Sequence, residues 1–335
     1  HVSTSVTDTL RGVTTYAYDA DGAVVTTTSP AGLSTRYAYD QAGRRTRVTD
    51  PAGGAWTATY SPRGEVTAER DPTGATRRFA YDAAGRMAEA TDANGARTHY
   101  AHDGAGRLTA TTDPLGGVTA RAYDPTGRLV SVTDPLGATT TRAYDPTGRL
   151  ARVEDPSGRG QSLTYDASGR LTIRTYADGT NVAYAYDQAG RRTSMTDATG
   201  TTTYAYDPMG RRTEEVSPRG RLAYTYDPAG RRASMTYPDD TEVAYTYDPA
   251  GRLTSLATPT GQITYAYDPD GRLTAEHLPQ GMERTYAYEA GRLARYARGD
   301  DHDTEVTTLT YDQAGRRVAQ RTNGRHATYA YDPAG

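Results

Sequence analysis

The 335-residue chain contains no cysteine and no lysine. The absence of cysteine excludes disulfide bridges, zinc–thiolate and iron–sulfur sites, and catalysis by a cysteine nucleophile. Every basic side chain is an arginine, and 38 arginines face 41 acidic residues, which gives a formal net charge of −3. Because a nucleic-acid groove needs an excess of basic residues, we expect no nucleic-acid partner.

Large aliphatic side chains are also scarce, since Leu, Ile, Val and Phe together make up about a tenth of the chain. No apolar run approaches the roughly 18 residues that a membrane-spanning helix needs, so we expect no membrane span. So few aliphatic residues are typical of disorder only when the net charge is high. Tyrosine, by contrast, occurs 28 times and glycine 35 times. Order must therefore come from something other than an aliphatic core.

A Tyr-Asp-x-x-Gly motif, or a close relative of it, recurs sixteen times. The spacing is 21 residues eight times in succession and then varies among 20, 21 and 23 residues. Arginine follows the glycine in thirteen of the fifteen copies that have a following residue, and the copy at Tyr288 is one residue shorter than the others. The copies begin at residues 18, 39, 60, 81, 102, 123, 144, 165, 186, 206, 226, 247, 267, 288, 311 and 331. A fixed period of this length predicts a repeat architecture.

A second turn signal lies midway between successive copies, as in Asp113-Pro114-Leu115-Gly116. Asp, Pro and Gly at the first, second and fourth positions are typical of a type I turn, which a left-handed glycine closes into a bulged hairpin. The six or seven residues between turns are rich in Thr, Tyr and Val, which favour strands. Turns this frequent leave no room for helices. We predict an all-β fold: antiparallel β-hairpin repeats of about 21 residues, roughly 30 strands in all, winding into a spiral sheet, barrel or hollow shell.

Side chains alternate between the two faces of a strand, so Tyr-x-Tyr pairs such as Tyr37/Tyr39 and Tyr184/Tyr186 share one face. Repeat upon repeat, they predict rows of tyrosine that replace the missing aliphatic core. The arginine after each glycine is expected to lie over a ring or to meet a turn aspartate. Because long open sheets curl or split and aliphatic residues are few, we expect a thin wall without a thick packed core.

The units Tyr123-Asp124-Pro125-Thr126-Gly127-Arg128-Leu129 and Thr133-Asp134-Pro135-Leu136-Gly137 resemble the YD repeat of the RHS (rearrangement hot spot) family, and the resemblance covers residues 10–335. It implies a β-strand spiral that forms a hollow shell. In RHS toxins and insecticidal toxin-complex proteins, such a shell encloses a C-terminal toxin. In teneurins and bacterial wall-associated proteins, similar repeats form extracellular barrels. The segment that ends the RHS core, with its Asp-Pro-x-Gly-Leu type sequence and self-cleaving aspartates, has no counterpart here, so no catalytic residue is carried over.

We expect residues 1–335 to form a single array of sixteen repeats. The chain begins at His1 without a methionine and stops within a motif at Gly335, so we expect it to be an internal piece of a longer protein. Any self-cleavage or toxin activity would then lie outside this chain. An array with an open end exposes unpaired strand edges, which makes neighbouring copies possible partners.

We expect no catalytic, cofactor-binding or metal-binding residue in the chain. Its histidines occupy unrelated phases of the repeat, so surface or packing roles explain them better than catalysis. No serine lies in a Gly-x-Ser-x-Gly elbow. Most aspartates are explained as turn initiators, although catalysis by a carboxylate pair stays open at this point. The histidines are His1, His99, His102, His277, His302 and His326.

Residues 298–303, with the sequence Arg298-Gly299-Asp300-Asp301-His302-Asp303, are the one local irregularity, and they coincide with the longest repeat spacing. The plainer interpretation is a longer hairpin tip. The sharper alternatives are a divalent-cation loop and an Arg-Gly-Asp adhesion tripeptide. The segment lacks the spacing of a calcium loop, and Arg, Gly and Asp are common enough here to form this tripeptide by chance.

The leading hypothesis is a structural shell segment that encapsulates and sequesters a C-terminal toxin or other cargo polypeptide for delivery. The alternative is an extracellular scaffold or adhesion module that binds carbohydrate or a partner surface through rows of tyrosine and arginine. A third class, an enzyme built on the repeats, has no convergent polar cluster in its favour, so we expect no enzymatic activity. Both leading hypotheses imply a secreted or cell-surface protein and no cofactor.

Overall fold

The computed structural model describes residues 3–9, 12–300 and 303–334, and it is almost entirely β-sheet. It contains 32 antiparallel strands of four to eight residues. This confirms the predicted all-β fold of hairpin repeats. Among the described residues, the one departure from strands and turns is the short 3-10 turn η1 (Pro279–Gly281), in which Gln280 adopts φ 65°.

The chain divides into two compact units. Unit 1 comprises His1–Arg97 and Ala244–Gly335, and unit 2 comprises Thr98–Val243. Strands β10 and β24 contain the two boundaries. Within each unit, strands that follow one another in sequence form antiparallel pairs.

Unit 1 holds β1 (Ser3–Thr7), β2 (Val13–Tyr18), β3 (Val24–Thr28), β4 (Ser34–Tyr39), β5 (Arg45–Thr49), β6 (Ala55–Tyr60), β7 (Val66–Arg70), β8 (Thr76–Tyr81), β9 (Met87–Thr91), β24 (Glu242–Tyr247), β25 (Leu253–Thr258), β26 (Gly261–Tyr267), β27 (Leu273–His277), β28 (Glu283–Glu289), β29 (Arg292–Gly299), β30 (Thr304–Tyr311), β31 (Arg317–Thr322) and β32 (Arg325–Thr328). Unit 2 holds β10 (Arg97–His102), β11 (Leu108–Thr112), β12 (Val118–Tyr123), β13 (Leu129–Thr133), β14 (Thr139–Tyr144), β15 (Leu150–Glu154), β16 (Gly160–Tyr165), β17 (Leu171–Tyr176), β18 (Asn181–Tyr186), β19 (Arg192–Asp197), β20 (Gly200–Tyr206), β21 (Arg212–Ser217), β22 (Gly220–Tyr226) and β23 (Arg232–Thr236).

The turn after each Tyr-Asp motif has the predicted chemistry, as the β12–β13 hairpin shows. The Gly127 N–H donates to the Asp124 carbonyl at 2.9 Å, and Gly127 adopts φ 88°, the left-handed region that favours glycine. The Asp124 carboxylate accepts the N–H groups of Thr126 and Arg128, each at 2.9 Å. The strand register shifts between Ala122 and Tyr123. This is a type I turn closed by a bulge, held by the aspartate side chain as well as by the backbone.

The two faces of the sheet differ in composition. One face, called the tyrosine face below, carries the Tyr-x-Tyr side chains and the residues that pair with them across the strands, such as Met195 opposite Tyr184. The other, called the alanine face, carries small and hydroxylated residues, such as Ala122 opposite Ser131. Ala185, between Tyr184 and Tyr186, is exposed while both tyrosines are half-buried.

Almost nothing in the sheet is fully buried, in agreement with the thin wall expected from the sequence. Among the hydrophobic residues that the structure describes, the buried ones are Tyr224, Val243 and Ala297. Most strand residues are half-buried. The wall is therefore held mainly by backbone pairing and by contacts along the sheet.

The β10–β11 turn offers a matched pair of glycines for testing the turn chemistry. Gly106 has φ 84°, so we expect Gly106→Ala to lower the free energy of unfolding by about 1–2 kcal/mol. Gly104 lies in the same turn, its φ is not left-handed, and a Cβ there meets nothing within 4 Å, so Gly104→Ala should be neutral or slightly stabilising. Urea titrations followed by circular dichroism compare the two variants. Equal destabilisation by both would contradict this account of the turn.

Candidate functional site

The repeated contact between neighbouring hairpins joins an aspartate, an arginine and a tyrosine, as Asp124, Arg128 and Tyr144 show. The Arg128 Nε donates to the Asp124 carboxylate at 2.6 Å, and the guanidinium lies 4.8 Å from the centre of the Tyr144 ring in the next repeat. The Tyr144 hydroxyl donates back to the Leu129 carbonyl at 2.8 Å. We call this arrangement the Asp–Arg–Tyr clamp. The sequence predicts either a ring contact or an aspartate contact, and here one arginine makes both.

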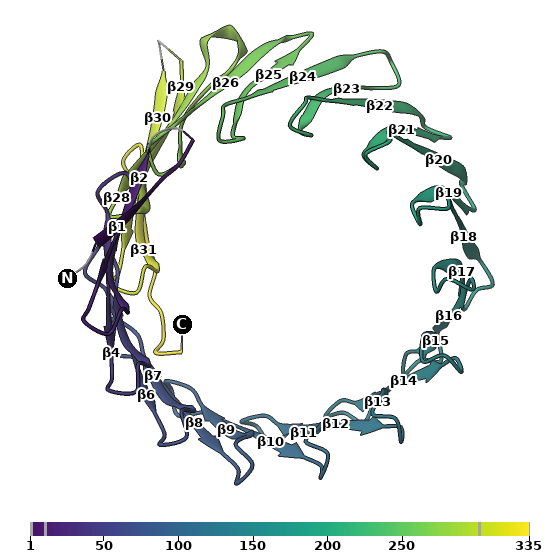
Figure 1. Cartoon of the computed structure of the whole chain (residues 1–335), viewed down its shortest axis with the longest axis horizontal. Coiled ribbons are helices and arrows are strands. Elements are labelled where there is room, and N and C mark those ends of the chain that lie inside the picture. The colour runs from purple at the N-terminus through teal and green to yellow at the C-terminus, as the bar shows by residue number, and fades with distance from the viewer. Residues whose placement is uncertain (1–2, 10–11, 301–302, 335) are drawn as a thin grey trace. The chain divides into compact units, whose positions relative to one another are not determined.

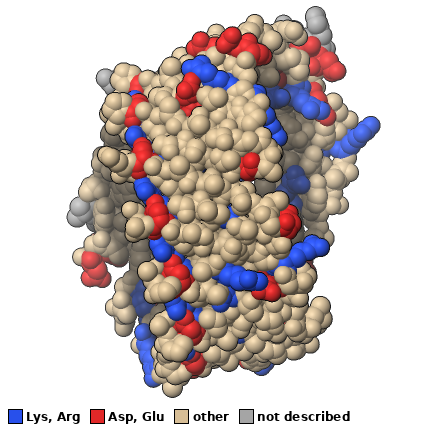
Figure 2. Space-filling view, turned by 90° about the vertical axis from the view of Figure 1, so that its right-hand side faces the viewer, with Lys and Arg blue, Asp and Glu red and all other residues tan. Residues whose placement is uncertain are grey.

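The clamp recurs through both units with nearly constant geometry. Its arginine often also donates to a backbone carbonyl of the next turn, as Arg149 does to Asp166 at 3.0 Å. The distance from guanidinium to ring centre lies between 4.7 and 5.0 Å in the ten copies named below. The arginine–tyrosine pairs are 44/60, 107/123, 128/144, 149/165, 170/186, 191/206, 211/226, 252/267, 272/288 and 316/331. Figure 2 shows acidic and basic side chains alternating along one edge, while most of the adjoining face is uncharged.

The turn carboxylates are held in their ionised form. The backbone N–H of Arg107, followed by its guanidinium, lowers the pKa of Asp103 below its usual range, against an opposing effect of burial. The backbone N–H of the clamp arginine is likewise the main cause of the lowered pKa of Asp40 and of Asp166. A carboxylate with a lowered pKa is a poor proton donor at neutral pH, so these aspartates act as hydrogen-bond acceptors in the turns and do not suit general acid catalysis.

In unit 1, turns of early and late repeats lie side by side and are joined by a seam between residues about 240 apart in sequence (Figure 1). The Asp270 carboxylate accepts the Ser29 hydroxyl at 3.0 Å and the Ala31 N–H at 2.9 Å. Arg292 forms an ion pair with Asp50. The seam therefore joins turns of the β26–β27 and β28–β29 hairpins to turns that follow β3 and β5.

Two departures from the repeat explain why these residues reach across the seam. In the short copy at Tyr288, the residue after the tyrosine is Glu289, and no aspartate lies four residues before Arg292. Arg292 pairs with Asp50 instead, and its Nη1 donates to the Asp312 carbonyl at 2.9 Å. Asp270 occupies the third turn position, where most other copies have Ala, Thr, Ser or Met and the first copy alone shares the aspartate, as Asp21. The seam thus uses side chains that ordinary copies of the motif lack.

Close backbone approach also shapes the seam at Gly54. A Cβ on Gly54 would lie 2.3 Å from the Gln313 carbonyl oxygen, a distance that no side chain tolerates. Comparable midway turns have alanine at this position, as at Ala75 and Ala138. Glycine at residue 54 is therefore required by the neighbouring turn, since the turn itself accepts alanine.

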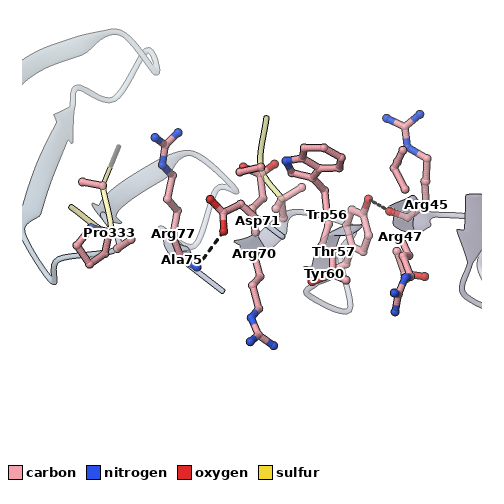
Figure 3. Close-up of a pocket in the computed structure, with 18 of the residues that line it drawn as sticks. Arg45, Arg47, Trp56, Thr57, Tyr60, Arg70, Asp71, Ala75, Arg77 and Pro333 are labelled. Atoms are coloured by element: carbon pink, nitrogen blue, oxygen red, sulfur yellow. Dashed lines mark hydrogen bonds between the residues drawn. The ribbon is translucent and has the colours of Figure 1, made fainter. Parts of the chain in front are cut away.

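A cavity of about 500 Å³ lies in unit 1 beside the seam (Figure 3). Trp56 and Arg77 point to one side of the strands, while Arg47 and Arg70 point to the other, and Pro333 lies at one end of the cavity. The lining mixes arginines with Glu69 and Asp71. In the part of the chain that the structure describes, no group of three or more His, Cys, Asp or Glu side chains could hold a metal ion. Within that same part, no helix is long and apolar enough to cross a membrane.

The histidines are scattered, as their repeat phases predict. His99 lies opposite Thr112 in β10–β11, and His102 takes the place of a motif tyrosine. The His277 Nδ1 lies 3.2 Å from a Glu283 carboxylate oxygen. His326 is exposed in β32. The two others, His1 and His302, lie outside the described residues.

The described residues of the irregular segment, Arg298, Gly299, Asp300 and Asp303, lie at the end of the long β29–β30 hairpin, where the plainer interpretation puts a hairpin tip. Arg298 belongs to β29 and its guanidinium is bound by the Glu305 carboxylate. The Asp303 N–H donates to the Asp300 carboxylate at 2.9 Å. Asp301 and His302 lie outside the described residues. The arginine of the Arg-Gly-Asp tripeptide is therefore already engaged within its own hairpin.

The seam was not predicted from the sequence, although three of its residues are visible there as departures from the repeat. The short copy at Tyr288, the additional acid at Asp270 and the second glycine of the Gly53-Gly54 pair are visible departures from the repeat. None of them shows which distant turn it meets. That information comes only from the way in which residues about 240 apart are brought together.

Comparison with known proteins gives the following similarities. A family model described as Teneurin YD-shell matches residues 55–221 and 195–334, and a model described as RHS Repeat matches residues 18–55. The crystal structure of TcdB2-TccC3-Cdc42 is similar over 95% of this chain, with a TM-score of 0.60 and 16% identity. The crystal structure of TcdB2-TccC3 without its hypervariable C-terminal region is similar over 92%, with a TM-score of 0.51 and 16% identity.

The chain spans about a quarter of the length of these structural relatives, covering 24% of each. At 16% identity the likeness is one of fold. None of the curated proteins matches the chain in sequence.

The hydroxyl of the clamp tyrosine can be tested alone, because phenylalanine keeps the ring that Arg128 covers. We expect Tyr144→Phe to lower the free energy of unfolding by about 0.5–1.5 kcal/mol, since the Leu129 carbonyl loses its hydrogen bond. Tyr176, which is 40% exposed and outside any clamp, provides the control, and Tyr176→Phe should change stability little. Thermal melts of both variants provide the measurement. A Tyr144→Phe protein as stable as its control would refute the role of the hydroxyl.

The seam can be tested at Asp270. Asp270→Ala removes the acceptor of the Ser29 hydroxyl and the Ala31 N–H, so we expect hydrogen exchange at the Ala31 amide to become about tenfold faster or more. Ser168→Ala changes the same turn position in unit 2, away from the seam, and should leave that amide unaffected. Exchange measured by NMR or mass spectrometry decides the outcome. Unchanged protection of residues 29–33 in Asp270→Ala would show that the seam does not depend on this carboxylate.

Proposed function

Because the chain belongs to the teneurin YD-shell family, whose model matches residues 55–334 in two overlapping segments, we propose that it is a wall segment of a hollow shell that sequesters a toxin or other cargo polypeptide. The family and the fold give the chain a shell-type structural role. Sequestration of cargo is the proposed purpose of that role. We also propose that all sixteen repeats of residues 1–335 serve as one wall.

The Asp–Arg–Tyr clamp is the observation that carries this proposal. A barrier has to be continuous and stiff, and each clamp ties a hairpin to the next through a ring contact and a hydrogen bond that are additional to the strand ladder. Opening the wall locally therefore requires breaking side-chain contacts as well as backbone hydrogen bonds. The mechanism is steric, because the wall keeps cargo away from its targets until it is delivered.

The polar groups of the wall support a structural role in place of an enzymatic one. The turn aspartates and the clamp arginines are engaged with each other and with backbone groups. The carboxylates of the clamps are held ionised, as at Asp103. We infer that catalytic activity, where the whole protein has any, resides outside these repeats, and that the shell is secreted or displayed at the cell surface with its cargo. The structural relatives are assemblies of TcdB2 with TccC3, one of them including Cdc42.

Limited proteolysis of the whole natural protein that contains these repeats tests the proposal. We expect proteinase K to leave at least one segment outside residues 1–335 intact while the wall is folded. The same segment should be digested in a variant that combines Asp270→Ala with Arg292→Gln, because the seam that joins distant repeats is then weakened. Ser168→Ala serves as the matched control and should preserve the protection.

Equal digestion of every segment outside the repeats, in the native protein and in the seam variant, would refute sequestration. In that case the alternative, an extracellular scaffold that binds carbohydrate or a partner surface, becomes the leading function. A glycan array probed with the purified repeats measures that activity directly, and an absence of binding there would exclude the carbohydrate form of the alternative.

A further inference from the structure

In strands β10 to β18 of unit 2, three strand arginines interrupt the tyrosine face. Arg121 in β12 and Arg142 in β14 occupy the position two residues before the motif tyrosine, where β18 has Tyr184. Arg174 lies on the same face in β17, because it pairs with Val182, which precedes Tyr184 by two residues. We call Arg121, Arg142 and Arg174 the arginine patch.

The arginine patch has apolar neighbours across the strands. Arg121 lies opposite Val132, Arg142 lies opposite Val153, and Arg174 lies between Leu163 and Val182. Arg121 donates through Nη1 to the Thr111 hydroxyl at 2.9 Å. Among the described residues, the Nη1 of Arg142 and the Nε of Arg174 are buried without a hydrogen-bond acceptor. A buried donor without an acceptor is costly, and it calls for a partner that the chain itself does not supply.

No carboxylate of these strands shares the face with the arginine patch. In β10 to β18 the single acidic strand residue is Glu154, which lies on the alanine face and pairs with Arg152 at 2.9 Å. Unit 1 shows the opposite arrangement on its tyrosine face, where Arg284 lies opposite Glu276 and forms an ion pair with it at 2.9 Å. The arginine patch therefore lacks the acidic partner that a comparable arginine has elsewhere.

Building on the proposed function, we propose that the arginine patch binds carboxylates of an extended, acidic segment of the cargo polypeptide. Arg121 and Arg142 are two strands apart and Arg174 is three strands further, which corresponds to spacings of about 10 and 14 Å. An extended chain advances about 3.3 Å per residue, so acidic residues three to four positions apart match both spacings. Guanidinium groups bind carboxylates through paired hydrogen bonds, and the valine and leucine neighbours suit the apolar parts of a peptide.

A polypeptide fits this surface better than a nucleic acid. Binding of a phosphate backbone depends on a long track of basic groups, whereas the strand residues of β10 to β18 offer only three arginines on this face, and apolar residues separate them. The whole chain also has a formal net charge of −3, which opposes the approach of a polyanion. A short acidic peptide segment carries only a few carboxylates, and the three arginines of the patch are enough to pair with them.

The binding test uses the 335-residue chain and a fluorescein-labelled peptide of Glu-Ser-Gly repeats, with a Gln-Ser-Gly peptide for comparison. We expect the glutamate peptide to raise the fluorescence anisotropy, to bind more weakly as salt increases, and to lose affinity about tenfold or more when Arg121, Arg142 and Arg174 are all replaced by glutamine. The control replaces three exposed arginines of unit 2, Arg152, Arg159 and Arg219, by glutamine. It removes the same charge and should retain binding.

Several results would overturn the proposal: equal binding of the two peptides, equal loss of affinity in the patch and control variants, or tighter binding of a single-stranded oligonucleotide than of the glutamate peptide. Circular dichroism melts show whether the patch variant folds, and we expect its melting temperature to be at least that of the control. The proteolysis of the whole protein separates the two proposals. If the cargo stays protected in the patch variant and peptide binding is unchanged, the arginine patch is not the cargo-binding surface. The proposal of a sequestering shell is then unaffected.

Discussion

The contact between a clamp arginine and the next tyrosine is the interaction on which the rest of the wall depends. A sheet with so few aliphatic residues gains little from burial, and its strands would otherwise be joined by backbone hydrogen bonds alone. In the clamp of Arg128 and Tyr144, the guanidinium covers the ring while the tyrosine hydroxyl satisfies the Leu129 carbonyl. One repeat thereby sets the position of the next. Because the contact involves only two neighbouring repeats and needs no central core, it can recur along an array of any length.

A repeat this regular can depart from its pattern at single positions without losing its fold. The short copy at Tyr288 lacks the turn aspartate, and Arg292 forms its ion pair with Asp50 across the seam instead. Asp270 adds an acceptor at a position where most other copies have small residues, and Gly54 leaves room for the Gln313 carbonyl. On the tyrosine face, the exchange of tyrosine for Arg121 and Arg142 removes aromatic packing and introduces charge that no carboxylate of that face neutralises.

The local structure was predictable from sequence because each of its causes is local. A turn of the type at Asp124–Gly127 requires a short-range set of residues, and the alternation of Tyr184 and Tyr186 follows from the geometry of one strand. The prediction for the arginine after the glycine was incomplete, since it offered a ring or an aspartate and the structure uses both. The seam was not predictable, because nothing within a single 21-residue repeat says which turn, about 240 residues away, Asp270 will meet.

By itself, the sequence determined the β-hairpins, the bulged turns, the family and the absence of a thick core, because these depend on residues a few positions apart and on composition. The tertiary structure decided three further features: the pairing of Arg292 with Asp50, the need for glycine at residue 54, and the burial of the Arg142 Nη1 and the Arg174 Nε without an acceptor among the described residues. The physical reason is that Asp50 and Gly54 meet residues more than 200 positions away, and a contact between residues so far apart is not encoded within any single repeat.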